Sequence, residues 1–280
     1  MSISSIIYNG NIIPSNQACI KSNDRSFTLG DGLFETILVK KSSFPALDYH
    51  WRRLEASAAI TGIAVPFTYQ ELELMLSQLI KKNKLQNKMA GARLTITSGE
   101  SERGILPSPQ TKPNFVIAVF ELASVISAEY SAIIVSVIKN EYAPCSRVKS
   151  TSYLDNILAK KEAVNLGYDE AILLNTASNI ADGAISNIYM VKNKQIFTPP
   201  ISDGALPGVV RSMLFEECDH QFSITEKSLS VADILDADEV FVTNALMGVR
   251  PVSRLNTKKF DFSPIANSIG NALRETKDYI

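Results

Sequence analysis

The order of short apolar runs along this chain of 280 residues constrains its fold more than any other feature. Runs such as FVIAVF have the length of a strand and fall far short of the roughly 20 apolar residues that cross a bilayer. Strand patterns dominate the first half, whereas strands and helices alternate in the second half. We therefore predict an α/β fold with mixed sheets, built as two domains.

The first half reads as paired strands with two helices. SIIYNGNIIP predicts two strands around an Asn-Gly turn, and a polar, glycine-bearing turn then leads to another strand in GLFETILV. Apolar spacing predicts helices over residues 48–63 and 69–82. ARLTITSG and NFVIAVFEL predict strands on either side of a proline-bearing loop at residues 100–113.

A break in the pattern separates the two predicted domains, which we place at residues 1–120 and 131–280 with a linker at 121–130. The second domain begins with the strand SAIIVSVIK and a helix over residues 155–166. It continues with the strands AILL, NIYMV and QIFTP, a helix over residues 208–218, the strand EVFVTNA and a C-terminal helix. Because clefts between domains often bind ligands, we expect a site there.

Composition argues against several classes of function. The formal net charge is -1, which gives no electrostatic footprint for nucleic acid or an anionic membrane. We see no signal peptide and therefore expect a cytoplasmic protein. The cysteines Cys19, Cys145 and Cys218 are widely separated and form neither a disulfide framework nor a zinc pattern. With His50 and His220 as the imidazoles, we expect neither a metal site nor a Ser-His triad.

Lys149 is the leading candidate for a catalytic residue. It stands just before a predicted helix, about thirty residues ahead of IADGAISNIYMV. A lysine at such a position is ordinarily solvated, but it can also hold pyridoxal phosphate as a Schiff base. That cofactor needs a lysine, an acid for its pyridine nitrogen and a cradle for its phosphate. The chain offers a candidate for each, in a consistent order.

Four further residues complete this set, and each has an ordinary structural explanation beside the functional one. Asp182, in a predicted Ala-Asp-Gly turn, either caps the backbone or holds the pyridine nitrogen protonated. Gly208 opens a predicted helix, where free amides can bind phosphate. Arg53 belongs either to a solvated helix face or to a bidentate phosphate contact. Arg103 is either an exposed loop residue or a partner for a substrate carboxylate.

Six stretches in order resemble the class IV aminotransferase family, the fold-type IV pyridoxal-phosphate enzymes, over essentially the whole chain. The resemblance implies a two-domain fold like that of D-amino-acid aminotransferases, pyridoxal 5'-phosphate as cofactor, a small-molecule amino or carboxylate substrate and a homodimer. The family includes branched-chain aminotransferases, D-amino-acid aminotransferases and 4-amino-4-deoxychorismate lyases. The six stretches are GDGLFETILV, HWRRL, VKSTSYLDNILAKKEA, ADGAISNIYMV, IFTPPISDGALPGVVR and ADEVFVTNALMGVRPV.

The resemblance also implies roles for single residues. Lys149 matches the Schiff-base lysine, Arg53 a phosphate-binding arginine, and Tyr153 the tyrosine that hydrogen-bonds the phenolic oxygen of the cofactor. Asp182 stands where the family usually has glutamate, which shortens the arm, and Val210 replaces a common threonine, which removes a phosphate-binding hydroxyl. The other implied cofactor contacts are Ser186, Asn187, Gly208, Val209, Asn244 and Ala245, and the implied substrate contacts are Phe34, Thr36, Arg103 and Leu246.

Three stretches, two of them parts of the six above, indicate the branch of the family. GDGLFET, SGESERG and NALMGVRPV resemble the lyases, whereas VKSTSYLDNILAKKEA and IFTPPISDGALPG are more similar to the aminotransferases. We predict a 4-amino-4-deoxychorismate lyase that releases pyruvate and 4-aminobenzoate for folate synthesis. The alternatives are a branched-chain or D-amino-acid aminotransferase and a non-catalytic homologue that binds the cofactor, since a fold does not determine a function.

Overall fold

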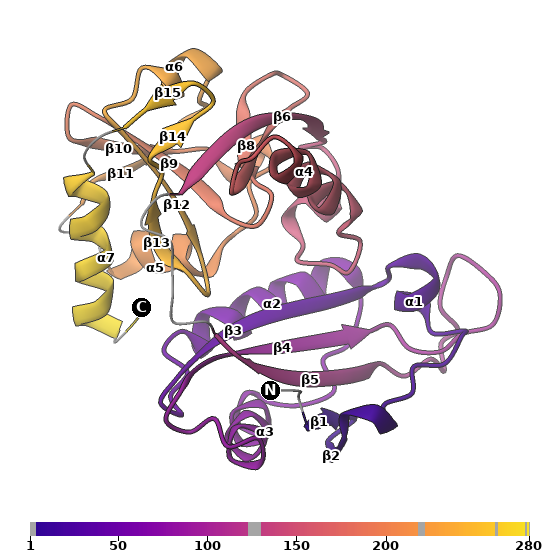
Figure 1. Ribbon diagram of the computed structural model, residues 1–280. Coiled ribbons are helices and arrows are strands. Elements are labelled where there is room, and N and C mark those ends of the chain that lie inside the picture. The colour runs from indigo at the N-terminus through magenta and orange to yellow at the C-terminus, as the bar shows by residue number, and fades with distance from the viewer. Residues whose placement is uncertain (1–3, 123–129, 218–221, 261–262, 278, 280) are drawn as a thin grey trace. The chain divides into compact units, whose positions relative to one another are not determined.

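The computed structural model describes residues 4–122, 130–217, 222–260, 263–277 and 279. The chain forms two compact units, which can be followed in Figure 1: one comprises residues 1–125 and 148–152, and the other residues 126–147 and 153–280. The segment that contains Lys149 therefore packs with the N-terminal unit although it lies far along the sequence. Most of the predicted linker lies outside the described residues, so the predicted domain boundaries stay a prediction.

The first unit is built on a five-stranded sheet with the order β2-β1-β5-β4-β3. Every pairing between these strands is antiparallel. Asn9 and Gly10 form the predicted turn between the first two strands with φ values of 47° and 83°, which asparagine and glycine tolerate best. The strands are β1 (Ser5–Tyr8), β2 (Asn11–Pro14), β3 (Gly32–Lys40), β4 (Met89–Thr97) and β5 (Asn114–Glu121).

Two helices cover one face of this sheet and confirm the predicted helical segments. α2 (Leu47–Thr61) and α3 (Tyr69–Lys82) bury apolar side chains in one core with β3, β4 and β5. Thr68 and Glu71 begin α3 with reciprocal side-chain to backbone hydrogen bonds, which satisfy amides that a first helical turn leaves unpaired. The opposite face carries Arg93, which is exposed, and Thr36, which is half-buried.

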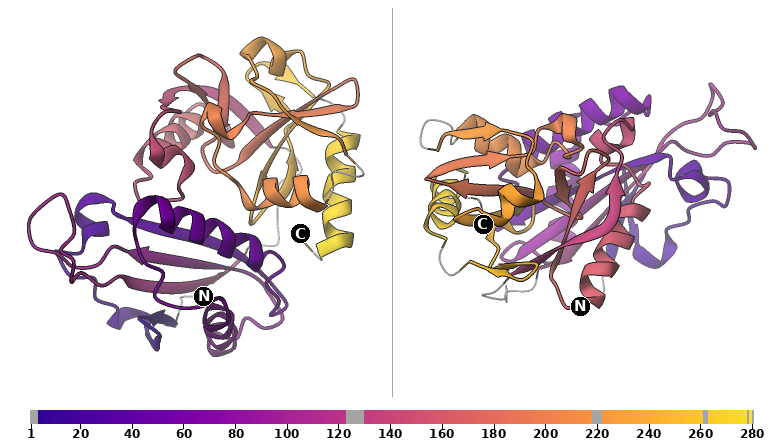
Figure 2. Two further views of the ribbon diagram at one scale, coloured as in Figure 1. Left: turned by 180° about the vertical axis from the view of Figure 1, so that it is seen from behind. Right: turned by 90° about the horizontal axis from the view of Figure 1, so that it is seen from above.

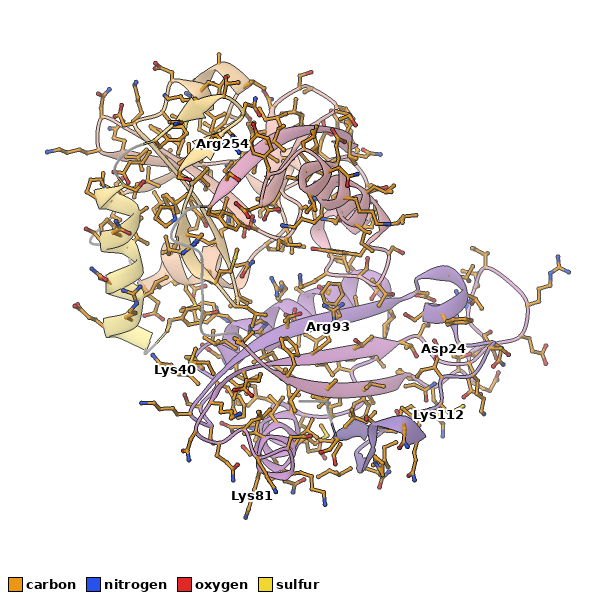
Figure 3. All side chains as sticks on the ribbon, in the orientation of Figure 1. Asp24, Lys40, Lys81, Arg93, Lys112 and Arg254 are labelled. Carbon is orange, nitrogen blue, oxygen red and sulfur yellow. The ribbon has the colours of Figure 1, made fainter. Side chains whose placement is uncertain are left out.

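The polar stretch before β3 is a short helix rather than the predicted turn. The helix α1 (Arg25–Leu29) is capped by Asp24, whose side chain accepts a hydrogen bond from the Ser26 amide. Asp24, labelled in Figure 3, is fully buried and also accepts hydrogen bonds from Thr97 and Asn114. Five residues are too few to show an apolar helical period, so the stretch resembles a loop in sequence.

The second unit contains two five-stranded sheets, ordered β11-β10-β9-β12-β13 and β15-β14-β6-β7-β8. Each combines parallel and antiparallel pairs, so the predicted mixed sheets occur in this unit. The predicted α/β class is confirmed. The strands are β6 (Ser131–Lys139), β7 (Glu170–Asn175), β8 (Ile180–Gly183), β9 (Asn187–Lys192), β10 (Gln195–Thr198), β11 (Ile224–Glu226), β12 (Glu239–Asn244), β13 (Gly248–Pro251), β14 (Arg254–Leu255) and β15 (Lys258–Lys259).

Helix α4 (Leu154–Asn165) connects the parallel strands β6 and β7 and packs against both, as parallel pairing requires of a crossover. The views in Figure 2 show the same elements from behind and from above. No helix among the described residues is long and apolar enough to span a membrane. The remaining helices are α5 (Val209–Glu217), α6 (Val231–Leu235) and α7 (Pro264–Lys277), with short 3-10 turns at Ser15–Gln17, Pro144–Arg147 and Ile201–Asp203.

The Ala181-Asp182-Gly183 segment belongs to β8 and is not the predicted turn. Asp182 pairs with Leu173 of β7, and every residue of β8 is buried. The turn comes earlier, where Ser178 adopts a positive φ of 63°. An Asp-Gly pair usually marks a turn, but here burial beside a neighbouring strand overrides that local preference.

Candidate active site

Strand β3 holds the segment that contains Lys149. The Phe34 amide donates a hydrogen bond to the Lys149 carbonyl, and the Thr151 amide donates one to the Gly32 carbonyl, each at 2.9 Å. The segment thus pairs with the edge strand of the first sheet, which fixes the lysine backbone. The Lys149 Nζ lies 4.4 Å from the centre of the Phe34 ring, a cation–π contact. A predicted substrate residue therefore contacts the predicted catalytic lysine.

Glu35 is a buried carboxylate that sequence reasoning missed. Arg53 donates from Nε to Oε1 at 2.8 Å and from Nη2 to Oε2 at 2.6 Å, and His50 Nδ1 lies 2.6 Å from Oε2. Burial alone would raise the pKa of Glu35, but the Arg53 guanidinium and the His50 ring outweigh it and hold that pKa well below its ordinary range. The signal in the sequence is an acid inside the apolar run LFETILV.

His50 is the neutral member of this cluster. Burial lowers its pKa, and the nearby cations Arg53 and Lys149 add to that effect, while Glu35 opposes it. A neutral ring donates its Nδ1 hydrogen to Glu35 and leaves Nε2 unprotonated. Glu35 therefore orients the Arg53 guanidinium, which is a predicted phosphate ligand, and His50 holds Glu35 in place.

Arg93 is a second residue that the sequence did not single out. Opposite Thr36 in the β3–β4 register, it donates from Nη1 to the Thr36 hydroxyl at 3.1 Å. Its guanidinium carbon lies 3.4 Å from the centre of the Phe34 ring, so Phe34 contacts both this guanidinium and the Lys149 amine. Arg93, labelled in Figure 3, is exposed. An exposed cation beside the predicted lysine is suited to bind a substrate carboxylate.

Arg103 has a different setting, on an exposed stretch of the loop at residues 100–113. Arg25 anchors this loop: it donates to the carbonyls of Gly104 and Ile105 at 3.2 and 2.6 Å and bonds Asp31 at 2.7 Å. Arg25 is itself 5% exposed, so these bonds are shielded from water. The loop is thus attached next to Arg103, whose predicted contact with substrate stays a prediction.

In the second unit, Asp182 is buried and held on both carboxylate oxygens. Oδ1 accepts a hydrogen bond from Asn187 Nδ2 at 3.1 Å, and Oδ2 accepts one from the Leu206 amide at 2.8 Å. The Lys139 Nζ lies 3.9 Å from Oδ2. Burial raises the pKa of Asp182 to about 6, and Lys139 is the largest opposing influence. Asp182 and Asn187, both predicted cofactor contacts, therefore lie together.

Asn187 also joins Asp182 to the turn at Gly208. Its Nδ2 donates to the Leu206 carbonyl at 2.7 Å. A Cβ at position 208 would lie 1.8 Å from Asn187 Oδ1, so only glycine fits there. Helix α5 begins directly after this glycine, and the first amides of a helix have no partner within it. The predicted phosphate cradle at Gly208, Val209 and Val210 is thus a compact helix start next to a buried acid.

Ser186 and Tyr153 both stabilise the connection between β8 and β9. Ser186 donates from Oγ to Glu170 Oε2 at 2.7 Å. Tyr153 donates from Oη to the Ala184 carbonyl at 3.2 Å, and Asn156 donates to the same carbonyl at 2.8 Å. The structure therefore gives these residues a role in shaping the loop that ends at Asn187, and their predicted cofactor contacts stay predictions.

The side chain of Asn244 stabilises the turn from Asn244 to Met247. Asn244 Oδ1 accepts hydrogen bonds from the amides of Leu246 and Met247 at 3.0 and 2.9 Å. Tyr279 donates to the Ala245 carbonyl at 2.7 Å. Because these two amides are already hydrogen-bonded, they are not available to donate to an anionic ligand.

The residues present fit pyridoxal phosphate. In the second unit, a buried carboxylate suits a protonated pyridine nitrogen, and a turn that excludes any Cβ suits close approach of a phosphate. In the first unit, an arginine fixed by a buried acid suits an anion. A family model described as amino-transferase class IV matches residues 32–255. The chain belongs to this family. The prediction of a pyridoxal-phosphate-dependent enzyme, either a lyase or a class IV aminotransferase, is confirmed.

Known members of the family that are similar to this chain differ in activity. An aminodeoxychorismate lyase of Bacillus subtilis is 29% identical over 254 residues, which cover 89% of this chain and 86% of the relative. A D-alanine aminotransferase of Bacillus licheniformis is 26% identical and covers 97% and 96% of the two chains. The solved branched-chain amino acid aminotransferase of Escherichia coli has a TM-score of 0.90 at 25% identity, covering 99% and 95%. These similarities leave the activity within the family open.

Proposed function

We propose that the chain is a 4-amino-4-deoxychorismate lyase, which eliminates pyruvate from its substrate to give 4-aminobenzoate for folate synthesis. The observation that carries the proposal is the position of Arg93, which shares the Phe34 ring with Lys149 and bonds Thr36. The lyase substrate carries two carboxylates, whereas the amino donors alanine and leucine carry one. A cation that shares a ring with the lysine favours a substrate bound through charged side chains.

Each part of the cofactor has a proposed partner. Lys149 binds its aldehyde carbon, Asp182 its pyridine nitrogen and Tyr153 its phenolic oxygen. When bound, pyridoxal phosphate withdraws electrons from the substrate carbon that carries the amine. Its phosphate is held by the guanidinium of Arg53, which Glu35 orients, and by the amides of Val209 and Val210 at the start of α5.

Lys149 then acts as the general base. Once the substrate amine has taken its place on the aldehyde carbon of the cofactor, the freed Nζ would remove the proton from the ring carbon that bears the amine. The bond from the neighbouring ring carbon to the enolpyruvyl oxygen breaks, and that oxygen leaves with the electron pair, so the ring becomes aromatic. The released enolpyruvate takes up a proton and becomes pyruvate. This elimination needs no keto acid, whereas transamination requires one to accept the amino group.

Arg93 and Thr36 orient the substrate for this proton transfer. The Thr36 hydroxyl and the Phe34 ring fix the guanidinium on the β3–β4 face, where it can form two hydrogen bonds to one carboxylate. Arg103, on the loop that Arg25 anchors, is the proposed partner of the second carboxylate. Positioning matters because an error of about 1 Å at the reacting atoms costs on the order of a hundredfold in rate.

The experiment that tests this proposal supplies enzymatically made 4-amino-4-deoxychorismate without any amino acid or keto acid. We expect equal amounts of 4-aminobenzoate and pyruvate, and neither product with Lys149→Ala. If no 4-aminobenzoate forms while D-alanine or leucine with 2-oxoglutarate yields glutamate, the chain is an aminotransferase. If neither reaction occurs although the protein takes up pyridoxal phosphate, the chain is a non-catalytic homologue. We also propose that the protein is cytoplasmic and forms a homodimer. Light scattering at micromolar concentration tests the homodimer.

A further inference from the structure

Lys139 is a half-buried cation that faces the carboxylate of Asp182. It ends strand β6, and its Nζ lies 3.9 Å from Asp182 Oδ2. The two side chains are 14% and 4% exposed, so little water screens the interaction. None of the predicted catalytic or cofactor contacts includes this lysine, which lies 43 residues before Asp182 in the sequence.

Among the described residues, the other groups that shift the pKa of Asp182 or sense its charge are neutral donors or acids. Asn187 on β9 and the Leu206 amide are neutral donors. Glu170 on β7 and Tyr189 on β9 are titratable, and each senses the Asp182 charge as a repulsion that raises its own pKa. Burial is the largest cause of both increases, so both groups are neutral over more of the pH range than when exposed. Lys139 is therefore the cation that favours the ionised form of Asp182.

The charge state of Asp182 decides what it can do for the proposed cofactor. An ionised carboxylate accepts the hydrogen of a protonated pyridine nitrogen, whereas a protonated carboxyl presents its own hydrogen. Burial already raises the pKa of Asp182 to about 6. A cation within about 4–6 Å lowers the pKa of a carboxyl by roughly 1–3 units, so losing Lys139 would bring protonation of Asp182 to neutral pH.

The Asp182 carboxylate is held in place, so it depends on the positive charge of Lys139 to stay ionised. Asn187 and Leu206 fix both oxygens, so the carboxylate cannot move toward solvent to stay ionised. We propose that Lys139 is a positioning residue, which pairs with Asp182 and keeps it an acceptor for the pyridine nitrogen of the bound cofactor. The role toward the cofactor rests on the proposed function, whereas the pairing itself is a property of the protein alone.

The first experiment measures Asp182 directly in the protein without cofactor. Aspartate carboxyl carbons are labelled with ¹³C, the Asp182 signal is assigned by its loss in Asp182→Asn, and the signal is followed against pH. We expect Lys139→Met to raise the midpoint by about one unit or more and Lys139→Arg to keep it near that of the original protein. Lys139→Gln replaces Lys139→Met if the latter does not fold.

A matched control is provided by Lys160, whose Nζ lies 4.0 Å from Oε1 of another buried carboxylate, Glu170. Lys160→Met removes a lysine from the same unit and should not raise the Asp182 midpoint. If Lys139→Met leaves that midpoint unchanged, or if the Arg and Met variants shift it equally, the proposed pairing is wrong.

The second experiment follows the dissociation constant of pyridoxal phosphate against pH. Relative to the original protein, Lys139→Met should bind about tenfold more weakly at pH 7 and recover toward pH 9, where Asp182 ionises even without its partner. A purely structural defect would give a constant ratio at all pH values and would overturn the role toward the cofactor. Failure of the original protein to bind pyridoxal phosphate would instead refute the proposed function, and the carboxyl titration would still decide the pairing.

Discussion

Arg53 and Glu35 form a buried pair with two hydrogen bonds, of 2.8 and 2.6 Å, that connects helix α2 to strand β3. The pair orients a guanidinium that we assign to the cofactor phosphate. It also stabilises the first unit, because a buried acid is tolerated only when its charge is compensated. The same contact thus serves the site and the fold, and the two effects can be separated by experiment.

Changing Glu35 to Gln should lower the free energy of unfolding at pH 7 by about 3–5 kcal/mol, because Arg53 is left buried without its counter-charge. The pKa of Glu35 is held below its ordinary range, so its stabilising effect is complete above that range and is lost as the pH falls. The difference between Glu35→Gln and the original protein should therefore shrink below about pH 4. Urea unfolding at a series of pH values measures it, and a difference independent of pH would contradict this account.

Changing Arg93 to Ala should raise the Michaelis constant for 4-amino-4-deoxychorismate by about tenfold to a hundredfold, because a charged hydrogen-bonding partner is lost. Uptake of pyridoxal phosphate should be unchanged. Arg254, which lies over the Tyr168 ring at 4.3 Å in the second unit, gives a matched control. Arg254→Ala should leave the Michaelis constant as it was. Equal losses in both variants, or weaker cofactor binding in Arg93→Ala, would show that Arg93 does not bind substrate.

The activity should fall on the acidic side as Asp182 takes up a proton. Burial raises the pKa of Asp182 to about 6 in the protein without cofactor, and a protonated pyridine nitrogen beside Asp182 would lower that pKa again. We expect kcat/KM to decrease about tenfold per pH unit on an acidic limb below pH 6, and this limb to move upward in Lys139→Met. An acidic limb at the same pH in both proteins, with the fold intact by circular dichroism, would argue against this assignment.

Loss of the Arg25 anchor should free the loop that carries Arg103. Arg25 bonds the carbonyls of Gly104 and Ile105, so Arg25→Ala should increase tryptic cleavage after Arg103 several-fold under native conditions. Mass spectrometry of the fragments measures the site and rate. Lys21, which pairs with Glu100 at 2.7 Å at the exposed start of the same loop, is the control. Lys21→Ala should change cleavage little, because exposed ion pairs contribute little. If cleavage after Arg103 is accelerated equally in both variants, then the hydrogen bonds of Arg25 do not hold the loop in place.

Local signals explain what the sequence predicted well. The Asn9-Gly10 turn and the apolar period of α2 and α3 depend on neighbours within a few residues. The same holds for Lys149 as a lysine directly before a helix. Asp182 was found as a candidate although its local structure was predicted wrongly, because its chemistry does not depend on whether the segment is a turn or a strand.

Contacts between distant segments explain what the sequence did not predict. Arg93 meets Thr36 because of the β3–β4 register, across 57 residues of sequence. Lys139 reaches Asp182 because β6, β7 and β8 are neighbours in one sheet. Strand register and order follow from packing of the whole unit, so no local pattern identifies either contact. Glu35 was within reach of sequence reasoning, since an acid in a buried strand requires a partner.

The turn at Gly208 gives the most sharply defined prediction. A Cβ at this position would lie 1.8 Å from Asn187 Oδ1, and Asn187 in turn bonds both Asp182 and the Leu206 carbonyl. Gly208→Ala should therefore displace Asn187, loosen the start of α5 and weaken pyridoxal phosphate binding by at least about tenfold, an energy of roughly 1.4 kcal/mol. Equilibrium titration of the protein without cofactor measures this change.

Gly270, within α7, is the matched control for Gly208→Ala. A Cβ there would meet its nearest atom, in Val249, at an ordinary 3.8 Å. Gly270→Ala should leave cofactor binding unchanged and raise the free energy of unfolding by about 0.5–1 kcal/mol, because alanine loses less conformational freedom in a helix than glycine does. If Gly208→Ala binds pyridoxal phosphate as tightly as Gly270→Ala, then the helix start at Val209 and Val210 is not where the phosphate is held.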